Sequence, residues 1–300
     1  MRFVLCALAL LTWIPSAQAY QTARLAIEHE GVEREALVDY NPTIAGAPVL
    51  IALHGGLAGP MTVRRKARVT LANEGWVVVW PSALGDWNDG RTNTEGQPYD
   101  SADDIGFLRK LVDELATRGF ADPNRVFFAG PSIGGVMVLR LICDAPDLVA
   151  GAAVAIASFA SGYECADGPP KPILYLHGTE DDLMPPEGGR IGGWNLLVKD
   201  RGWVRPVSET LETLSRRNGC DGFEESALPD TAKDDGSTVL LRSYQGCAAP
   251  LKHYVVEGGG HTWPGAEPSR LGSGIVGETN RDISATREIE AFFRKLATGG

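Results

Sequence analysis

Positive charge is scarce in this sequence, since 28 lysine and arginine residues stand against 38 aspartate and glutamate residues, for a net charge of -10. Nucleic-acid binding depends on basic side chains that displace counterions from phosphates, so DNA and RNA are not expected partners. Internal repeats are lacking too, which excludes solenoid architectures. With 44% hydrophobic and 22% charged residues, the chain has enough apolar material for a large core and is expected to fold.

The sequence also lacks a hydrophobic run long enough to cross a membrane, which takes about 20 apolar residues. The apolar stretch Phe3–Ile14 is shorter, with Arg2 before it and the small-residue triplet Ala17-Gln18-Ala19 after it. This combination is typical of a secretory signal peptide. We therefore expect residues 1–19 to be removed, no membrane anchor to remain, and the protein to be secreted or periplasmic from Tyr20 onward.

Cysteine is rare, with five in 300 residues, and Cys6 lies in the predicted leader. An even number in an oxidising compartment predicts two disulfides, the alternative being four buried thiols. Four cysteines allow three pairings, and sequence-local pairs are favoured because each would close off a polar loop. The spacing does not indicate zinc, and no metal or cofactor is expected. The favoured pairs are Cys143 with Cys165 and Cys220 with Cys247.

Short apolar runs rich in β-branched residues alternate with helical hydrophobic patterns along the chain. The alternation predicts an α/β protein with a mostly parallel central sheet and helices on both faces. Residues 22–40 could add two leading antiparallel strands. No linker divides the chain, so residues 20–300 are interpreted as one domain, with Gly219–Gly246 as its most irregular stretch. The expected strands are Val49–Leu53, Trp76–Trp80, Val126–Ala129, Ala152–Ile156, Ile173–Leu176 and His253–Val256. The first expected helix starts within Ser101–Asp104 and stops at Gly119, and the others are Val136–Cys143, Val207–Arg217 and Ile283–Leu296.

The segment Gly130-Pro131-Ser132-Ile133-Gly134-Gly135 follows a predicted strand and precedes a predicted helix. This context is typical of the nucleophile elbow, a turn so tight that glycine is needed two residues before and two residues after the serine. Ser132 is therefore the candidate nucleophile. The alternative is a glycine-rich turn with an unreactive serine.

A serine nucleophile needs a histidine to take its proton and a carboxylate to orient that histidine. Of the five histidines, His261 is the best placed, because it follows the strand His253–Val256 and a run of three glycines. The loop after Ile173–Leu176 contains Glu180, Asp181 and Asp182, and spacing alone does not choose among them.

An oxyanion hole requires backbone N–H groups that face the serine. One donor is expected to be the amide of Ile133. The other is expected to be the amide of Gly56, with Gly55 and Leu57 as near alternatives. His54, just before these glycines, is interpreted as a residue that fixes the loop and not as the base.

These residues resemble a known family, the secreted esterases similar to polyhydroxybutyrate depolymerases and feruloyl esterases, which have the α/β-hydrolase fold. The resemblance spans residues 53–264 and implies that Asp181 is the catalytic acid, with Ser132 as nucleophile and His261 as base. Pro131 and Gly56 depart from the family pattern, where a larger apolar residue and cysteine are common. The segments that carry the resemblance are Leu53-His54-Gly55, Trp87-Asn88-Asp89-Gly90-Arg91, Asp103-Asp104-Ile105-Gly106-Phe107, the elbow Gly130–Gly135 with the preceding Asp122-Pro123-Asn124-Arg125-Val126, His177-Gly178-Thr179-Glu180-Asp181 and Gly259-Gly260-His261-Thr262-Trp263-Pro264.

The sequence therefore predicts a secreted serine hydrolase that cleaves small or oligomeric carboxylic esters through an acyl-enzyme. A peptidase or amidase using the same triad is the first alternative, because the leaving group is not encoded in the motif. The second is a non-catalytic polymer-binding protein on a hydrolase scaffold, which would be expected to lack a triad member. Because no separate adsorption module is recognised, soluble esters are expected to be better substrates than solid polyester.

Overall fold

The structure is a computed structural model that describes residues 20–56, 58–192, 201–267 and 273–299. The predicted signal peptide, residues 1–19, and Leu57 lie outside the described residues. Within the described ranges, no helix combines the length and the apolar character that a membrane crossing requires.

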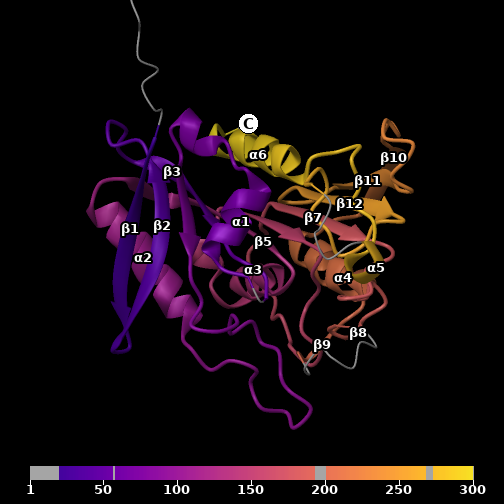
Figure 1. Ribbon diagram of the computed structural model, residues 1–300, viewed down its shortest axis with the longest axis horizontal. Coiled ribbons are helices and arrows are strands. Elements are labelled where there is room, and N and C mark those ends of the chain that lie inside the picture. The colour runs from indigo at the N-terminus through magenta and orange to yellow at the C-terminus, as the bar shows by residue number, and fades with distance from the viewer. Residues whose placement is uncertain (1–19, 57, 193–200, 268–272, 300) are drawn as a thin grey trace, which may run out of the picture.

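A ten-stranded sheet forms the centre of the molecule, and Figure 1 shows its first two strands at one side and its last three at the other. The six central strands run parallel, while antiparallel pairs complete both edges. The order across the sheet is β1 (Gln21–His29), β2 (Val32–Tyr40), β4 (Val77–Pro81), β3 (Ala47–Ala52), β5 (Ala121–Pro131), β6 (Gly151–Ala155), β7 (Ile173–Gly178), β12 (Leu251–Glu257), β11 (Thr238–Gln245) and β10 (Gly222–Ala227). A separate short pair consists of β8 (Gly189–Arg190) and β9 (Trp203–Val204).

Helices cover both faces of the sheet, and each face has its own hydrophobic cluster. One cluster packs the sheet against α2 (Asp104–Thr117), α3 (Ile133–Asp144) and α4 (Val207–Asn218). The other packs it against α1 (Pro60–Ala67) and α6 (Ala285–Ala297). The remaining helical segments are α5 (Ser273–Val276) and the 3-10 turns η1 (Leu71–Glu74) and η2 (Pro146–Leu148). The predicted α/β class, with a mostly parallel sheet and helices on both faces, is confirmed.

All six strands predicted within the parallel sheet are present, and so are the two leading antiparallel strands. Strands β4, β6 and β7 are buried along their whole length, which is why they appear in the sequence as unbroken apolar runs. The prediction that Gly219–Gly246 is the most irregular stretch is wrong. This stretch contains the hairpin β10–β11, whose first strand is exposed along its whole length and therefore lacks a hydrophobic pattern.

The carboxyl ends of parallel strands meet at one edge of a sheet, and the loops that follow β3, β5, β7 and β12 all leave from that edge. These loops carry Gly55, Ser132, Asp181 and His261, respectively. The topology therefore brings together residues that are up to 206 positions apart in the chain.

Candidate active site

Ser132 occupies a strained turn between β5 and α3, with φ 56° and ψ -133°. A side chain at Gly130 would overlap the backbone of Gly134, and a Cβ at Gly134 would lie 2.6 Å from the carbonyl oxygen of His54. Both glycines are thus required by close backbone approach, as the elbow pattern predicts. The amide of Ser132 donates to the carbonyl of Ala155, which fixes the turn against β6.

The side chains of Ser132, His261 and Asp181 form a continuous hydrogen-bonded chain. His261 Nε2 lies 3.0 Å from Ser132 Oγ, and His261 Nδ1 lies 2.7 Å from Asp181 Oδ2. The neutral imidazole that accepts from the serine must therefore hold its proton on Nδ1, where it donates to Asp181. In this arrangement the histidine can accept the serine proton while the aspartate stabilises the positive ring that results.

Asp181 is oriented by its own loop. Its Oδ1 accepts the amides of Leu183 and Met184 at 3.0 and 2.8 Å, which leaves Oδ2 directed at His261. Asp181 is buried, whereas its neighbours Glu180 and Asp182 are exposed. The geometry therefore brings Asp181, and neither neighbour, to the histidine.

The glycine run before His261 ties its loop to the loop of Asp181. The amide of Gly258 donates to Thr179 Oγ1 at 2.9 Å, and the carbonyl of Gly259 accepts the amide of Glu180 at 2.9 Å. The amide of Gly260 donates to the carbonyl of Glu278. Because these bonds join the two loops directly, the distance between His261 and Asp181 is set by backbone contacts.

The predicted oxyanion donors lie beside the serine. Ile133 is the first residue of α3, and the first amides of a helix have no carbonyl of the same helix to bond to. Its amide can therefore donate to an oxyanion. A Cβ built at Gly55 would lie 3.4 Å from Ser132 Cβ, and one built at Gly56 would lie 3.3 Å from Ile133 Cδ1. The loop after β3 therefore passes directly in front of the elbow. The third residue considered from the sequence, Leu57, lies outside the described residues.

His54 fixes this loop, as its interpretation from sequence predicts. Its Nδ1 donates to the carbonyl of Gly55 at 2.9 Å, and its Nε2 accepts the amide of Ala83 at 3.1 Å. The indole N–H of Trp87 donates to the carbonyl of His54 at 2.9 Å. Burial lowers the pKa of His54, so the neutral ring is favoured in the folded chain.

The segments around Trp87 and Asp104 hold the loop whose Trp87 contacts His54. Arg91, which is buried, binds both carboxylate oxygens of Asp89 through Nε at 2.8 and 2.7 Å. Burial raises the pKa of the Asp89 carboxyl to about 6, against the opposing charge of Arg91. Asp104 accepts the amide of Asn88 at 2.6 Å and pairs with Arg34 at 2.5 Å. These two motifs thus anchor the loop that carries Trp87.

Sequence reasoning missed one ion pair at the site. Arg201 Nη1 donates to Asp86 Oδ2 at 3.1 Å, and the same nitrogen lies only 2.5 Å from where a Cβ at position 56 would stand. The guanidinium thus fills the space beside Gly56 that a larger residue would need. The two partners are 115 positions apart, and neither belongs to a recognisable motif, so the sequence offers no signal for this contact.

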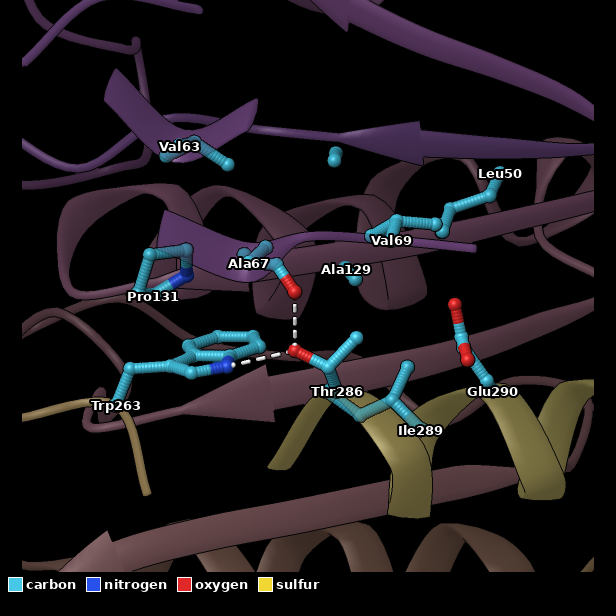
Figure 2. A pocket seen from close by; sticks show the side chains of 12 residues that line it. Leu50, Val63, Ala67, Val69, Ala129, Pro131, Trp263, Thr286, Ile289 and Glu290 are labelled. Atoms are coloured by element: carbon cyan, nitrogen blue, oxygen red, sulfur yellow. Dashed lines mark hydrogen bonds between the residues drawn. The ribbon is translucent and has the colours of Figure 1, made fainter. Parts of the chain in front are cut away.

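Pro131, the other departure from the family pattern, borders a small apolar cavity of about 20 Å³ between the sheet, α1 and α6 (Figure 2). This volume is about that of one water molecule. Trp263 closes one side of the cavity, and its indole N–H donates to Thr286, whose hydroxyl donates to the carbonyl of Ala67. The cavity is too small for a substrate, so the effect of Pro131 here is one of packing.

The structure joins Cys143 to Cys165 and Cys220 to Cys247, the two pairs that the sequence favours. The second disulfide closes the base of the β10–β11 hairpin. Among the described residues, His29, Glu30 and Asp103 form a cluster whose ligand atoms lie within 4.8 Å of one another. This cluster is at the β1–β2 turn and the start of α2, away from Ser132, and His29 already contacts Asp103 at 3.0 Å.

Comparison with known proteins gives relatives named as esterases and a partial match to a peptidase family. NocK of Nocardia uniformis subsp. tsuyamanensis, provisionally named an esterase, is 31% identical over 253 residues, which cover 80% of this chain and 72% of that protein. Feruloyl esterase B of Piromyces equi is 27% identical over 233 residues, which cover 72% of this chain but only 39% of the esterase. A model of the prolyl oligopeptidase family matches residues 62–162.

Among solved structures, the acetyl xylan esterase from Aspergillus awamori superposes with a TM-score of 0.59 at 15% identity. The match covers 91% of this chain and 98% of that one. At this level of identity the likeness concerns the fold, and it extends over nearly all of both chains.

Proposed function

Because this chain belongs to the α/β-hydrolase serine esterases, we propose that Ser132, His261 and Asp181 hydrolyse carboxylic esters through an acyl-enzyme. The observation that carries the proposal is the hydrogen-bonded chain from Ser132 Oγ through His261 to Asp181, at 3.0 and 2.7 Å. Nucleophile and base lie within hydrogen-bond reach, and a third group orients the base.

In the first half of the reaction, His261 Nε2 takes the proton of Ser132 as Oγ attacks the ester carbonyl. The carbonyl oxygen becomes negatively charged and is held by the amides of Ile133 and Gly56. Collapse of this intermediate breaks the bond to the alcohol oxygen, which leaves with the proton from His261. The products of this half are a free alcohol and an acyl group on Ser132.

In the second half, His261 takes a proton from water as the water oxygen attacks the acyl group. The same amides hold the oxyanion, and the acid leaves as Ser132 regains its proton from His261. Throughout, Asp181 accepts the hydrogen bond from Nδ1–H of His261 and holds that proton in place. No cofactor takes part in these steps.

Amide hydrolysis is the second candidate function, favoured by the match of residues 62–162 to the prolyl oligopeptidase family. The two candidates use the same triad and differ in the leaving group. Since an amine leaves less readily than an alcohol, the triad alone does not imply amidase activity. A pair of substrates with one acyl group and different leaving groups separates them.

We test the function with 4-nitrophenyl butyrate and its amide counterpart, butyryl 4-nitroanilide, each with the native chain and with Ser132→Ala. We expect hydrolysis of the ester at a much higher kcat/KM than the anilide, and loss of both activities in Ser132→Ala. Comparable kcat/KM values for the two substrates would move the function to an amidase. Ester hydrolysis that survives in Ser132→Ala would remove the proposed nucleophile.

The proposed function also indicates a class of natural substrate, though not one compound. By their names, the relative from Piromyces equi acts on feruloyl esters and the protein from Aspergillus awamori acts on acetyl xylan. We propose that this chain acts on small or oligomeric esters, and a panel of feruloyl sugars, acetylated xylo-oligosaccharides and hydroxybutyrate oligomers ranks them. The expected winner is a soluble ester, and rapid clearing of a crystalline polyester suspension would point to a solid substrate instead.

We also propose that the protein is exported, with Tyr20 as the first residue of the mature chain. Two disulfides support export, because such bonds form and persist in oxidising compartments. Peptide mapping of the secreted or periplasmic fraction should begin at Tyr20. Recovery of the chain in the cytosol with Met1 in place would contradict the proposal.

A further inference from the structure

Arg201 places a positive charge next to the proposed oxyanion site. Its Nη1 lies 2.5 Å from the Cβ position of Gly56, and that position is in turn 3.3 Å from Ile133 Cδ1. The amides of Gly56 and Ile133 are the two proposed oxyanion donors. A group that hydrogen-bonds to Arg201 would therefore lie beside the same residue that holds the ester carbonyl.

A hydrogen bond to its backbone carbonyl holds Arg201 in position. Arg91 Nη1 donates to the carbonyl of Arg201 at 2.6 Å, and Arg91 is itself held by Asp89 and by the ring of Tyr99, whose centroid is 4.7 Å from the guanidinium carbon. Arg91 is buried, so this anchor is rigid. The side chain of Arg201 keeps 16% of its surface exposed, so it is not sealed off from solvent.

The carboxylate of Asp86 is shared between Arg201 and Arg91. Asp86 Oδ2 lies 3.1 Å from Arg201 Nη1 and also 3.6 Å from Arg91 Nη2. In the described part of the chain, Arg91 Nη2 is a buried donor without a hydrogen-bond partner. Asp89 is committed to Arg91 Nε. Two guanidinium groups thus compete for the carboxylate of Asp86, and a further acceptor beside Arg201 would be stabilised.

We infer that Arg201 is a specificity-determining residue that binds a carboxylate of the substrate, so that the preferred esters carry an anionic group a few bonds from the scissile carbonyl. The inference rests on the proposed function, since it uses the oxyanion site at Gly56 as its reference point. Hydrogen bonds between a guanidinium and a carboxylate are among the strongest that a protein makes to a ligand. A short oligomer of a hydroxy acid, which ends in a free carboxylate, has the required chemistry.

A purely structural role for the Arg201–Asp86 pair makes a different prediction. If the pair only holds its loop in place, removing either partner should lower activity on every ester alike. If Arg201 binds substrate, the partners should act in opposite directions, because Asp86 competes with the substrate for the guanidinium. The variants Arg201→Gln and Asp86→Asn therefore separate the two roles, and Arg201→Lys, which keeps the charge, tests for rescue.

The substrates are the linear dimer of 3-hydroxybutyrate, with its terminal carboxylate, and the same dimer with a neutral terminal primary amide. Release of 3-hydroxybutyrate or its amide is measured by chromatography, and the readout is the ratio of kcat/KM for the anionic dimer to that for the neutral dimer. Arg24→Gln serves as the matched control, because it removes an exposed arginine on the edge strand β1 from its ion pair with Glu35 on β2.

We expect the native chain to prefer the anionic dimer and Arg201→Gln to lower the ratio by about ten- to a hundredfold, mainly through KM. Arg201→Lys should recover part of the ratio, Asp86→Asn should raise it, and Arg24→Gln should leave it unchanged. Equal losses on both dimers in Arg201→Gln and Asp86→Asn, or a native ratio near one, would overturn the inference while leaving the esterase function in place. Failure of the native chain to hydrolyse either dimer or 4-nitrophenyl butyrate would overturn the proposed function itself.

Discussion

At the scale of single residues, the strained serine and the backbone-held aspartate determine what the site can do. Ser132 has a positive φ that a non-glycine residue rarely adopts, and such strain persists only where the surrounding structure enforces it. The surrounding structure here consists of two glycines whose side chains would have collided with the backbone. Strain and close approach together direct Oγ toward His261.

Two adjacent aspartates provide the sharpest residue-level prediction. Asp181→Asn should keep the fold but lower kcat/KM for 4-nitrophenyl butyrate by roughly 10⁴-fold, because an amide can no longer hold His261 in the productive tautomer. Asp182→Asn, one position along the same loop, should change it less than threefold, since Asp182 is exposed. Circular dichroism checks the fold of both variants. The opposite order of effects would shift the acid by one residue.

Sequence reasoning reached Ser132 and His261 because each lies in a motif with a fixed relation to a strand, whereas only the family resemblance chose Asp181 from the three acidic residues of its loop. The glycines around Ser132 stand where the backbone leaves no room for a side chain. The glycine run before His261 stands where the backbone bonds to the neighbouring loop. The sequence did not reveal the ion pair of Asp86 with Arg201, because an ion pair between two loops has no local sequence pattern. A contact of this kind depends on where the loops end in space, and that information is spread over the whole fold.

At the scale of elements, two neighbouring strands share a buried histidine pair. His253 Nε2, on β12, and His177 Nδ1, on β7, lie 2.8 Å apart. Burial lowers the pKa of His177 to about 4, and burial together with the neighbouring His177 lowers the pKa of His253 well below its ordinary value. Both rings are thus neutral in the folded chain at pH values where they are protonated in the unfolded chain.

This pair predicts a loss of stability in acid. Because the folded pKa is depressed, the contribution is fully present above the unfolded pKa of about 6.5 and is lost as the pH falls toward 4. Between pH 6.5 and 5, His177 alone should lower the free energy of unfolding by about 2 kcal/mol. Urea denaturation at a series of pH values measures this slope.

The control for the histidine prediction is the native chain, measured in the same pH series. His177→Gln should flatten the pH dependence of the urea midpoint, because it removes one of the two buried rings. An unaltered slope in His177→Gln would show that other groups control the acid sensitivity.

The β10–β11 hairpin makes a second prediction at this scale. Its edge strand β10 is exposed throughout, so burial contributes little to its stability. The disulfide between Cys220 and Cys247 closes a segment with a sequence separation of 27 at its base. Replacing both cysteines by alanine should lower the free energy of unfolding by about 3 kcal/mol, by restoring chain entropy to the unfolded state. An unchanged urea midpoint in the double variant would contradict this role.

The hairpin also shows why element prediction failed where it did. Strands β4 and β6 are continuously buried and therefore stand out as apolar runs. Strand β10 has no buried face, and helix α1 buries only Val63 and Ala67 of its eight residues. Elements that contribute little to the core leave little trace in the hydrophobic pattern, whatever their backbone conformation.

At the scale of the whole molecule, one sheet with hydrophobic clusters on both faces runs from β1 to β10. We propose that residues 20–300 form a single domain, and the continuity of the sheet supports this. The oxidised mature chain should then unfold in one cooperative transition, with equal calorimetric and van't Hoff enthalpies. Two resolved transitions in scanning calorimetry would divide the chain into separate units.

The central claim is that Ser132 is a base-activated nucleophile, and covalent labelling tests it most directly. A fluorophosphonate probe should modify the folded protein at one site, and peptide mass spectrometry should place the adduct on Ser132, since only an activated serine reacts quickly. Labelling should slow by orders of magnitude in His261→Ala and vanish in Ser132→Ala. Labelling that persists in Ser132→Ala, or an adduct on another serine of the native chain, would contradict the account.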